Sequence, residues 1–311
     1  MVTAEVSTRI GGTDGRPKRA VLTSLVLGAV LTAVVALVGG TPREAEAAFP
    51  EKIVFVSQRT TGAGVDNPTG DHEIFTMNPD GTSVKQLTFN TVTDLEPTLS
   101  PDGTKVAYQS NGIQTSNPEG DYEIYRVNTQ DGTDPVNLTN NGAGVDDYDP
   151  VISPNGTKIA YESRGIQPSN PEGDFEVYRM NAVDGTGKKN LSNNGLGLND
   201  GSPDFSSDGT RIAYMSSGKQ TSNPEGDREV YRMNAVDGTG KKNLTNNGAD
   251  VYDTSPDFSP DGQKIAYMSE GAQTSNPEGD LEVYRLNVMD GTGQTNLSNG
   301  GGEDSSSEWG G

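Results

Sequence analysis

Carboxylates at short, regular spacing are the residues of this chain best suited to chemistry. A recurring loop reads Asn-Pro-Glu-Gly-Asp-x-Glu, so each copy carries three acids, the last two separated by one residue. Oxygen-rich loops that turn at a glycine can hold Ca²⁺, although this spacing differs from that of an EF-hand. Calcium is therefore the one candidate cofactor, and a purely structural acidic turn is favoured over it. The candidate metal ligands are Glu119, Asp121, Glu123, Glu172, Asp174, Glu176, Glu225, Asp227, Glu229, Glu278, Asp280 and Glu282.

A second set of acids supplies one aspartate per repeat, just before the strand expected to lie innermost. Carboxylates gathered at one mouth of a channel repel one another unless they are solvated, share a cation or accept hydrogen bonds. Capping of backbone amides is the favoured role, and a shared cation is the alternative. These channel-mouth acids are Asp94, Asp147, Asp200, Asp253 and Asp304.

Catalytic motifs are scarce in the sequence. The chain has one histidine, His72, and no cysteine, so a single chain cannot build a multi-histidine metal site or use a cysteine nucleophile. A pair of carboxylates of the glycosidase type stays open. However, the acids recur in every repeat, whereas a catalytic site normally occupies one place. Whether the chain is an enzyme stays uncertain, and a non-catalytic role is favoured.

The elements that must position these acids are short strands in a repeat. The first aspartate of the Asp-x-Glu segment falls at residues 71, 121, 174, 227 and 280, so the period is 50 residues once and then 53. Each period contains four segments rich in Ile, Val and Tyr, separated by Asp-Gly or Asn-Gly turns, and no helical pattern. In the third repeat we expect strands at 150–153, 158–163, 176–180 and 188–191. Four antiparallel strands per repeat predict an all-β fold, a β-propeller.

The two ends of the repeat region complement each other. Residues 52–57 align with the second strand of a repeat, and residues 304–309 align with a first strand. We therefore expect five four-stranded blades, closed by pairing of the C-terminal strand with the N-terminal blade, which leaves no exposed sheet edge. In such a meander the long loops after the second strand and the blade-to-blade loops share one face, here called the loop face. The Asp-Gly turns share the opposite face, here called the turn face.

The N-terminal segment differs in composition from the repeats. Arg16, Lys18 and Arg19 precede an apolar run at residues 20–38 and the small-residue segment 45–48. This order is typical of a signal peptide, with an uncleaved signal anchor as the alternative. We assign residues 1–47 to it and residues 48–311 to a single propeller, which would be secreted, periplasmic or at the cell surface. Any membrane contact would come through that segment alone.

Charge narrows the class of partner. Residues 48–311 hold 18 Lys and Arg against 40 Asp and Glu, a surface that repels nucleic acid. A protein or another cell-envelope macromolecule is the expected partner, and the loop face, with its irregular acidic segments, is the expected contact surface.

One repeat also resembles a known family. The segment from Asp253 through Pro256, Phe258, Asp261-Gly262 and Ile265-Ala266-Tyr267, followed by Glu282-Val283-Tyr284, is similar to the WD40-like repeat of TolB-type propellers. The resemblance covers about residues 51–309 and implies an exported propeller that binds other macromolecules.

We therefore expect an exported, non-catalytic binding or scaffold propeller whose acidic loop face contacts another macromolecule, with calcium binding at that face as an alternative to a purely structural role of the acids. The alternative is a metal-dependent hydrolase or lyase that uses the channel-mouth aspartates as ligands.

Overall fold

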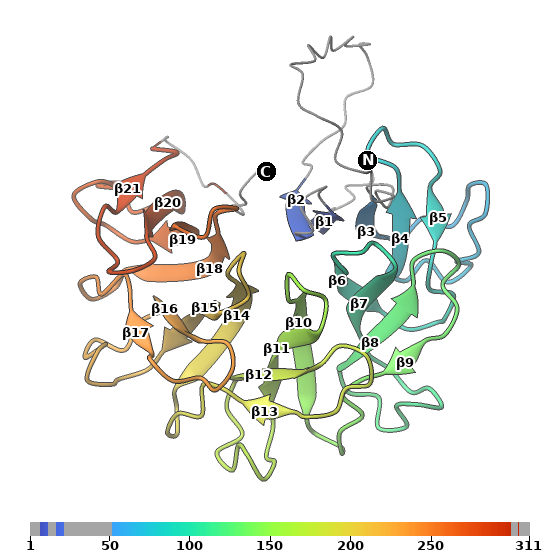
Figure 1. Ribbon diagram of the computed structural model, residues 1–311, viewed down its shortest axis with the longest axis horizontal. Coiled ribbons are helices and arrows are strands. Elements are labelled where there is room, and N and C mark those ends of the chain that lie inside the picture. Colours follow the sequence, from blue (N-terminus) through green and yellow to red (C-terminus); the bar gives the residue numbers. More distant parts are fainter. Residues whose placement is uncertain (1–6, 12–16, 22–51, 300–303, 305–311) are drawn as a thin grey trace, which may run out of the picture.

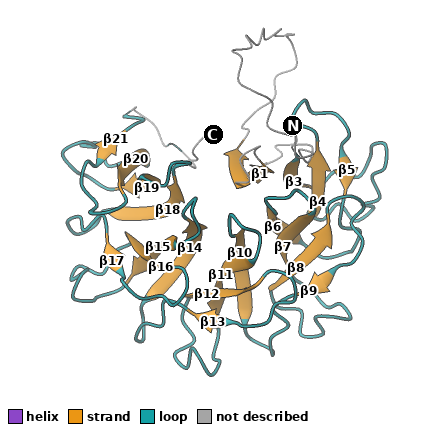
Figure 2. Cartoon of the chain, in the orientation of Figure 1, coloured by secondary structure: helices purple, strands orange, loops and turns teal. Residues whose placement is uncertain are grey.

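The computed structural model describes residues 7–11, 17–21, 52–299 and 304. Those residues form five antiparallel sheets set around a ring, which confirms the predicted five-bladed propeller (Figure 1). Strands and loops account for all of the described chain, and none of it is helical (Figure 2). Accordingly, the described part offers no helix that could cross a membrane.

Each blade from the second onward runs from the centre of the ring to its rim in chain order. The innermost strands are β6 (Asp94–Leu99), β10 (Asp146–Ile152), β14 (Asn199–Phe205) and β18 (Tyr252–Phe258). The second strands are β3 (Ile53–Ser57), β7 (Lys105–Ser110), β11 (Lys158–Arg164), β15 (Arg211–Ser217) and β19 (Lys264–Glu270). The third strands are β4 (Glu73–Met77), β8 (Glu123–Asn128), β12 (Glu176–Asn181), β16 (Glu229–Asn234) and β20 (Glu282–Asn287). The rim strands are β5 (Lys85–Gln86), β9 (Val136–Asn137), β13 (Lys189–Asn190), β17 (Lys242–Asn243) and β21 (Thr295–Asn296).

The first blade differs at its inner edge. Strand β1 (Ser7–Gly11) pairs with β3 and with β2 (Pro17–Val21), so this sheet has the order β2-β1-β3-β4-β5. The closing strand expected at 304–309 lies outside the described residues except for Asp304. The amide of Asp304 donates to the Leu281 carbonyl at 2.8 Å, as the amide of Asp253 does to the Arg228 carbonyl. Of the apolar run at residues 20–38, Ala20 and Val21 lie in β2 and residues 22–38 lie outside the described residues, so the export segment stays a prediction.

Paired aromatic rings hold the middle of every blade. A ring on the second strand lies opposite a ring on the third, and Tyr161 and Tyr178 are register partners with centroids 5.8 Å apart. The Tyr178 hydroxyl reaches Ser169 in the long loop at 2.9 Å, which ties that loop to the blade. Buried aromatic pairs contribute about 0.5–1.5 kcal/mol beyond the area that they bury. The tyrosines that recur on the second and third strands therefore pack the blade and also hold the long loop in position.

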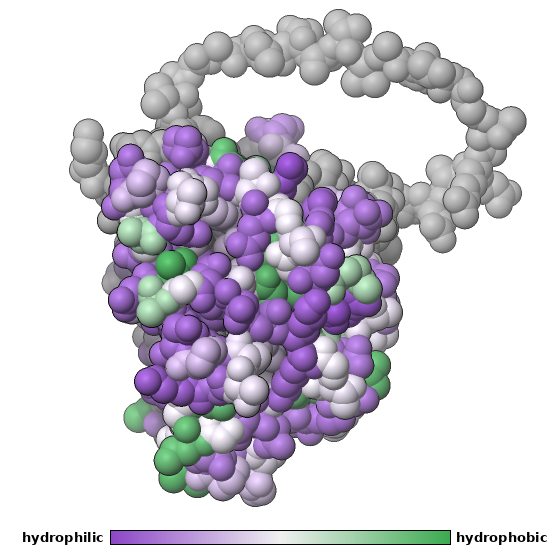
Figure 3. All heavy atoms as spheres, turned by 90° about the vertical axis from the view of Figure 1, so that its left-hand side faces the viewer, coloured by the Kyte–Doolittle hydropathy of each residue, from purple (hydrophilic) through white to green (hydrophobic). Residues whose placement is uncertain are grey.

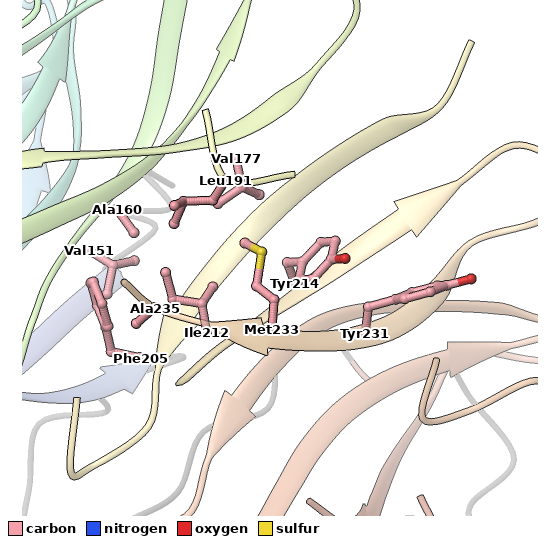
Figure 4. Packing of buried hydrophobic residues seen from close by; sticks show 10 residues of the cluster. All are labelled: Val151, Ala160, Val177, Leu191, Phe205, Ile212, Tyr214, Tyr231, Met233 and Ala235. Atoms are coloured by element: carbon pink, nitrogen blue, oxygen red, sulfur yellow. The ribbon is translucent and has the colours of Figure 1, made fainter. Parts of the chain in front are cut away.

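The hydrophobic core lies between neighbouring blades. One cluster joins Val151, Ala160 and Val177 of the third blade to Ile212 and Met233 of the fourth (Figure 4). The second strand of each blade also packs against the innermost strand of the next, as β11 does against β14. Because one blade cannot bury both faces alone, each junction is a core in its own right.

Candidate functional site: the loop face and its carboxyl junctions

The last glutamate of each Asn-Pro-Glu-Gly-Asp-x-Glu loop opens a third strand and points into the protein. The side chains of Glu123, Glu176 and Glu229 are each 1% exposed. Each accepts a hydrogen bond from a hydroxyl at the start of the blade-to-blade loop, as Glu123 does from Thr139. Its second oxygen accepts the amide of Asn141 at 2.7 Å. These glutamates therefore fasten one blade to the loop that leads to the next.

The predicted channel-mouth aspartates occupy the same junctions. Asp94, Asp147, Asp200 and Asp253 are wholly buried, so they do not form a solvated ring at an open mouth. The Asp94 carboxylate accepts from the Asn90 amide group at 2.8 Å, and the other three accept from Asn141, Asn194 and Asn247. Side-chain amides thus bind these carboxylates, where capping of backbone amides was expected. Asp304 is partly exposed.

The first four junctions therefore each bury an acid pair, and burial raises the pKa of both members. Desolvation raises the pKa of Glu73 to about 8 and that of Asp94 to about 6, and each lies close enough to interact with the other. Desolvation raises the pKa of Asp253 to about 8; the Glu229 charge adds to the rise, and a hydrogen bond from Ser269 opposes it. Two carboxylates in a dry site cannot both stay ionised, so we infer that each pair holds a proton near neutral pH.

Two junctions add a lysine. Lys188 and Lys241 precede the rim strands β13 and β17, and their ammonium groups donate to the carbonyls of Thr139 and Ser192. Desolvation raises the pKa values of both Asp200 and Glu176, and the positive charge of Lys241 offsets part of that rise. At the following junction Gln294 takes this place and donates to the Thr245 carbonyl at 3.0 Å. The chain thus contains lysine and glutamine versions of one junction.

Replacing Lys241 with glutamine tests this arrangement. We expect Lys241→Gln to lower the free energy of unfolding at pH 8 by about 1.5 kcal/mol, since a charged hydrogen bond is lost beside two acids. The reverse change, Gln294→Lys, should stabilise the next junction at the same pH. Chemical denaturation of both variants measures the effect. If both variants were destabilised, or both stabilised, to the same extent, the role given to the ammonium group would be contradicted.

The acidic loops are closed by asparagine. The Asn117 amide group donates to the Asp121 carbonyl at 2.7 Å, and its oxygen accepts the Gly120 amide at 3.0 Å. The same two bonds recur around Asn67, Asn170, Asn223 and Asn276. An asparagine that bonds its own loop in this way mimics a backbone turn. The loops therefore keep their shape through the chain's own groups.

The three acids of each loop do not converge on one point. In the second blade Glu119 is exposed, Glu123 is turned into the junction, and Asp121 accepts the Gly144 amide at 3.2 Å. One oxygen of Asp121 is buried without a hydrogen-bond partner. Even so, the described residues contain no group of three or more acids or histidines placed to hold a metal ion. The geometry does not fit a chelated cation, and calcium binding at these loops stays a prediction.

An aromatic patch breaks the symmetry of the loop face. The rings of Tyr122 and Tyr148 lie 4.9 Å apart, and those of Tyr148 and Phe175 lie 6.1 Å apart, all three partly exposed. Arg164 covers Phe175 at 5.1 Å and forms an ion pair with Asp146 at 2.9 Å. We call these five residues the aromatic patch.

Sequence reasoning missed the aromatic patch, although a signal was present. Tyr122 and Phe175 stand at the variable position of Asp-x-Glu, where the other repeats carry His72, Arg228 and Leu281. A position that varies inside an otherwise regular repeat is where one blade can acquire a contact of its own.

Comparison with known proteins agrees with the architecture. A family model described as the TolB beta propeller domain matches residues 58–223, more than half of the chain. A protein TolB homolog of Chlorobium luteolum is 32% identical over 172 residues, which cover 54% of this chain and 32% of that protein. The chain therefore spans about a third of the length of this relative.

Two solved structures share the fold. TolB of Acinetobacter baumannii has a TM-score of 0.55 at 21% identity, with 81% of this chain and 54% of that chain covered. A TolB-type protein of Agrobacterium tumefaciens has a TM-score of 0.57 at 20% identity, with 95% and 89% covered. With the family model covering most of the described repeats, the chain belongs to the TolB β-propeller domain family.

Proposed function

We propose that this chain is an exported, non-catalytic binding propeller whose aromatic patch docks a protein or another cell-envelope macromolecule. The observation that carries the proposal is the patch itself, three partly exposed rings on a face otherwise built from repeated acidic loops. Aromatic residues and arginine are the side chains that most often dominate binding energy at interfaces. Export is supported by the N-terminal basic and apolar segments and by similarity to TolB proteins.

The surroundings of the patch indicate the chemistry of the partner. Ile113, Ile166 and Leu196 lie in loops of the same face and are 79%, 78% and 81% exposed. Acids such as Glu119 and Glu172 are exposed between them. Away from the patch, the side of the molecule that carries the fourth and fifth blades is mostly hydrophilic, with scattered hydrophobic residues (Figure 3). We therefore expect a partner that presents apolar side chains next to basic ones.

The buried acid pairs support a binding role over a catalytic one. Their raised pKa values resemble those of general acids, but Glu123 and Asp147 are 1% and 0% exposed and so have no surface from which to meet a substrate. Their hydrogen bonds join neighbouring blades. In this proposal they are structural.

Photo-crosslinking in the native host tests the proposal. A crosslinking residue at position 166, on the loop face, should give a discrete adduct. The same residue at position 183, which is on the turn face and comparably exposed at 69%, should give none. Adducts of equal yield at both positions, or none at either, would contradict it.

Calcium is tested separately. Because Asn117 and its counterparts close the loops, we expect the melting temperature to change by less than about 1 °C between EDTA and millimolar Ca²⁺. A cation that bound only the folded state would add about 2.7 kcal/mol to the free energy of unfolding at a concentration of about a hundred times its Kd. A rise of several degrees would show that the loop acids rearrange around calcium.

A further inference from the structure

A cavity at the junction of the first two blades, on the turn face, differs from the other junctions. Its volume is about 600 Å³, and Lys52, Thr76, Lys85, Lys105, Thr129 and Gln130 line it. It lies on the face opposite the aromatic patch, so it is independent of the proposed function.

A missing arginine distinguishes this junction. Arg126, Arg179 and Arg232 stand at one position of their third strands and reach the turn of the next blade. Arg126 donates to the Val183 carbonyl at 2.8 Å, and Arg179 donates to the Ala235 carbonyl at 2.9 Å. In the first blade this position is Thr76, whose side chain cannot cross the junction.

Three lysines surround the space, and each binds a neutral oxygen. Lys52 donates to the Asn78 side chain at 2.7 Å, Lys105 to the Asn128 side chain, and Lys85 to the Gln130 carbonyl. Asp131 also lines the cavity, with one oxygen held by Thr133. Three ammonium groups and one carboxylate leave a net positive lining in a chain of net charge −21.

Two threonines that line the cavity carry hydroxyl groups without a hydrogen-bond partner. The Oγ1 atoms of Thr76 and Thr129 are buried and unpaired, and the two residues are 3% and 6% exposed. A buried polar group without a partner is unfavourable, and native proteins rarely leave one without a reason. In the next blade Ala182 replaces Thr129, so a hydroxyl is not needed there to close a junction.

We propose that this cavity binds a phosphate, either free or as the monoester group of a small molecule. Hydroxyl and ammonium donors around a net charge of about +2 complement a tetrahedral dianion. Lysines held on neutral oxygens can turn to a stronger acceptor without breaking an ion pair. The volume leaves room for a substituent beyond the phosphate itself.

Calorimetric titration with inorganic phosphate and with phenyl phosphate, at constant ionic strength, tests the proposal. Both ligands should bind at one site, and phenyl phosphate should bind at least as tightly as inorganic phosphate. Lys85→Gln and Thr76→Val should each weaken binding at least tenfold. Lys242→Gln is the matched control, because Lys242 holds the place of Lys85 in the fourth blade and donates to the Met289 carbonyl at 3.2 Å. It should leave binding unchanged.

Absence of phosphate binding to the wild type at millimolar concentration would overturn the proposal. Equal weakening by Lys85→Gln and Lys242→Gln would also overturn it, because it would indicate diffuse attraction to any lysine.

Discussion

Gly238→Ala should lower the free energy of unfolding by about 3 kcal/mol or more and the melting temperature by about 10 °C. Gly238 has φ of +75°, in the left-handed region, where a side chain is already unfavourable. In addition, a Cβ there would meet the Leu191 carbonyl oxygen of the preceding blade at 2.0 Å. Since the Cβ is fixed to the backbone of one blade and the oxygen belongs to the backbone of the other, relief requires the blades to separate.

Gly240→Ala is the matched control for this effect. Gly240 has φ of +66°, but the nearest atom to its Cβ position is an Asn234 side-chain nitrogen at 3.5 Å. Only the backbone strain of about 1–2 kcal/mol is expected there. Thermal and denaturant unfolding of both variants separates strain from blade contact. A loss at Gly240 as large as that at Gly238 would show that the close approach between blades contributes nothing.

The second large effect is a decrease in stability as pH rises from about 5 to about 9. The folded protein keeps protons on carboxyls such as Asp200 and Asp253, whose pKa values are about 8, whereas the unfolded chain releases them near pH 4. Between those values the folded state binds more protons, so the free energy of unfolding falls as pH rises. Each pKa unit corresponds to about 1.4 kcal/mol per group, and the pairs recur around the ring.

Asp200→Asn isolates one junction. The Asn194 amide group that now donates to Asp200 can donate equally to an amide oxygen, while the charge and the titration disappear. We expect a gain on the order of 2 kcal/mol at pH 9 and little change at pH 5. A gain that is independent of pH would show that the Asp200 carboxyl does not titrate between those values.

The turn face adds the opposite trend below pH 4. Hydrogen bonds from threonine hydroxyls and amides lower the pKa values of exposed Asp184 and Asp237. Such groups favour the folded state above their unfolded pKa, and the benefit is lost as pH falls through the folded pKa. Maximum stability is therefore expected near pH 4–5, measured as the free energy of unfolding across pH.

Local signals explain how much of the fold could be predicted. Asp-Gly turns, paired tyrosines and a fixed period depend on neighbours within one blade, and they located the second and third strands well. The innermost strand was expected at 150–153, but β10 begins at Asp146. Its first residues are acidic and resemble a loop. They are strand because they pair with residues 162–164 of β11. On its other side the Asp147 amide donates to the Tyr122 carbonyl of the preceding blade at 2.8 Å, a contact that the sequence of one blade does not reveal.

The same limit applies to the site. Glu123 was grouped with Glu119 and Asp121 because they are neighbours in sequence. Its actual partners are Thr139 and Asn141, at the next junction. Alternation along an extended chain places residues two apart on one side, but it cannot show that a hydroxyl sixteen residues later draws one acid into the core. The aromatic patch likewise joins an innermost strand to two loops, so the variable position of Asp-x-Glu could not by itself show that three rings meet.

A binding titration with the crosslinked partner, once it is purified, tests most directly whether the aromatic patch binds a macromolecule. Tyr148→Ser combined with Phe175→Ser should weaken binding by at least thirtyfold, because each truncation of an interface aromatic commonly costs about 2 kcal/mol. The control pair on the turn face, Val183→Ser with Val236→Ser, should change the Kd less than about twofold. Equal affinity for both double variants, or a greater loss from the turn-face pair, would contradict the claim.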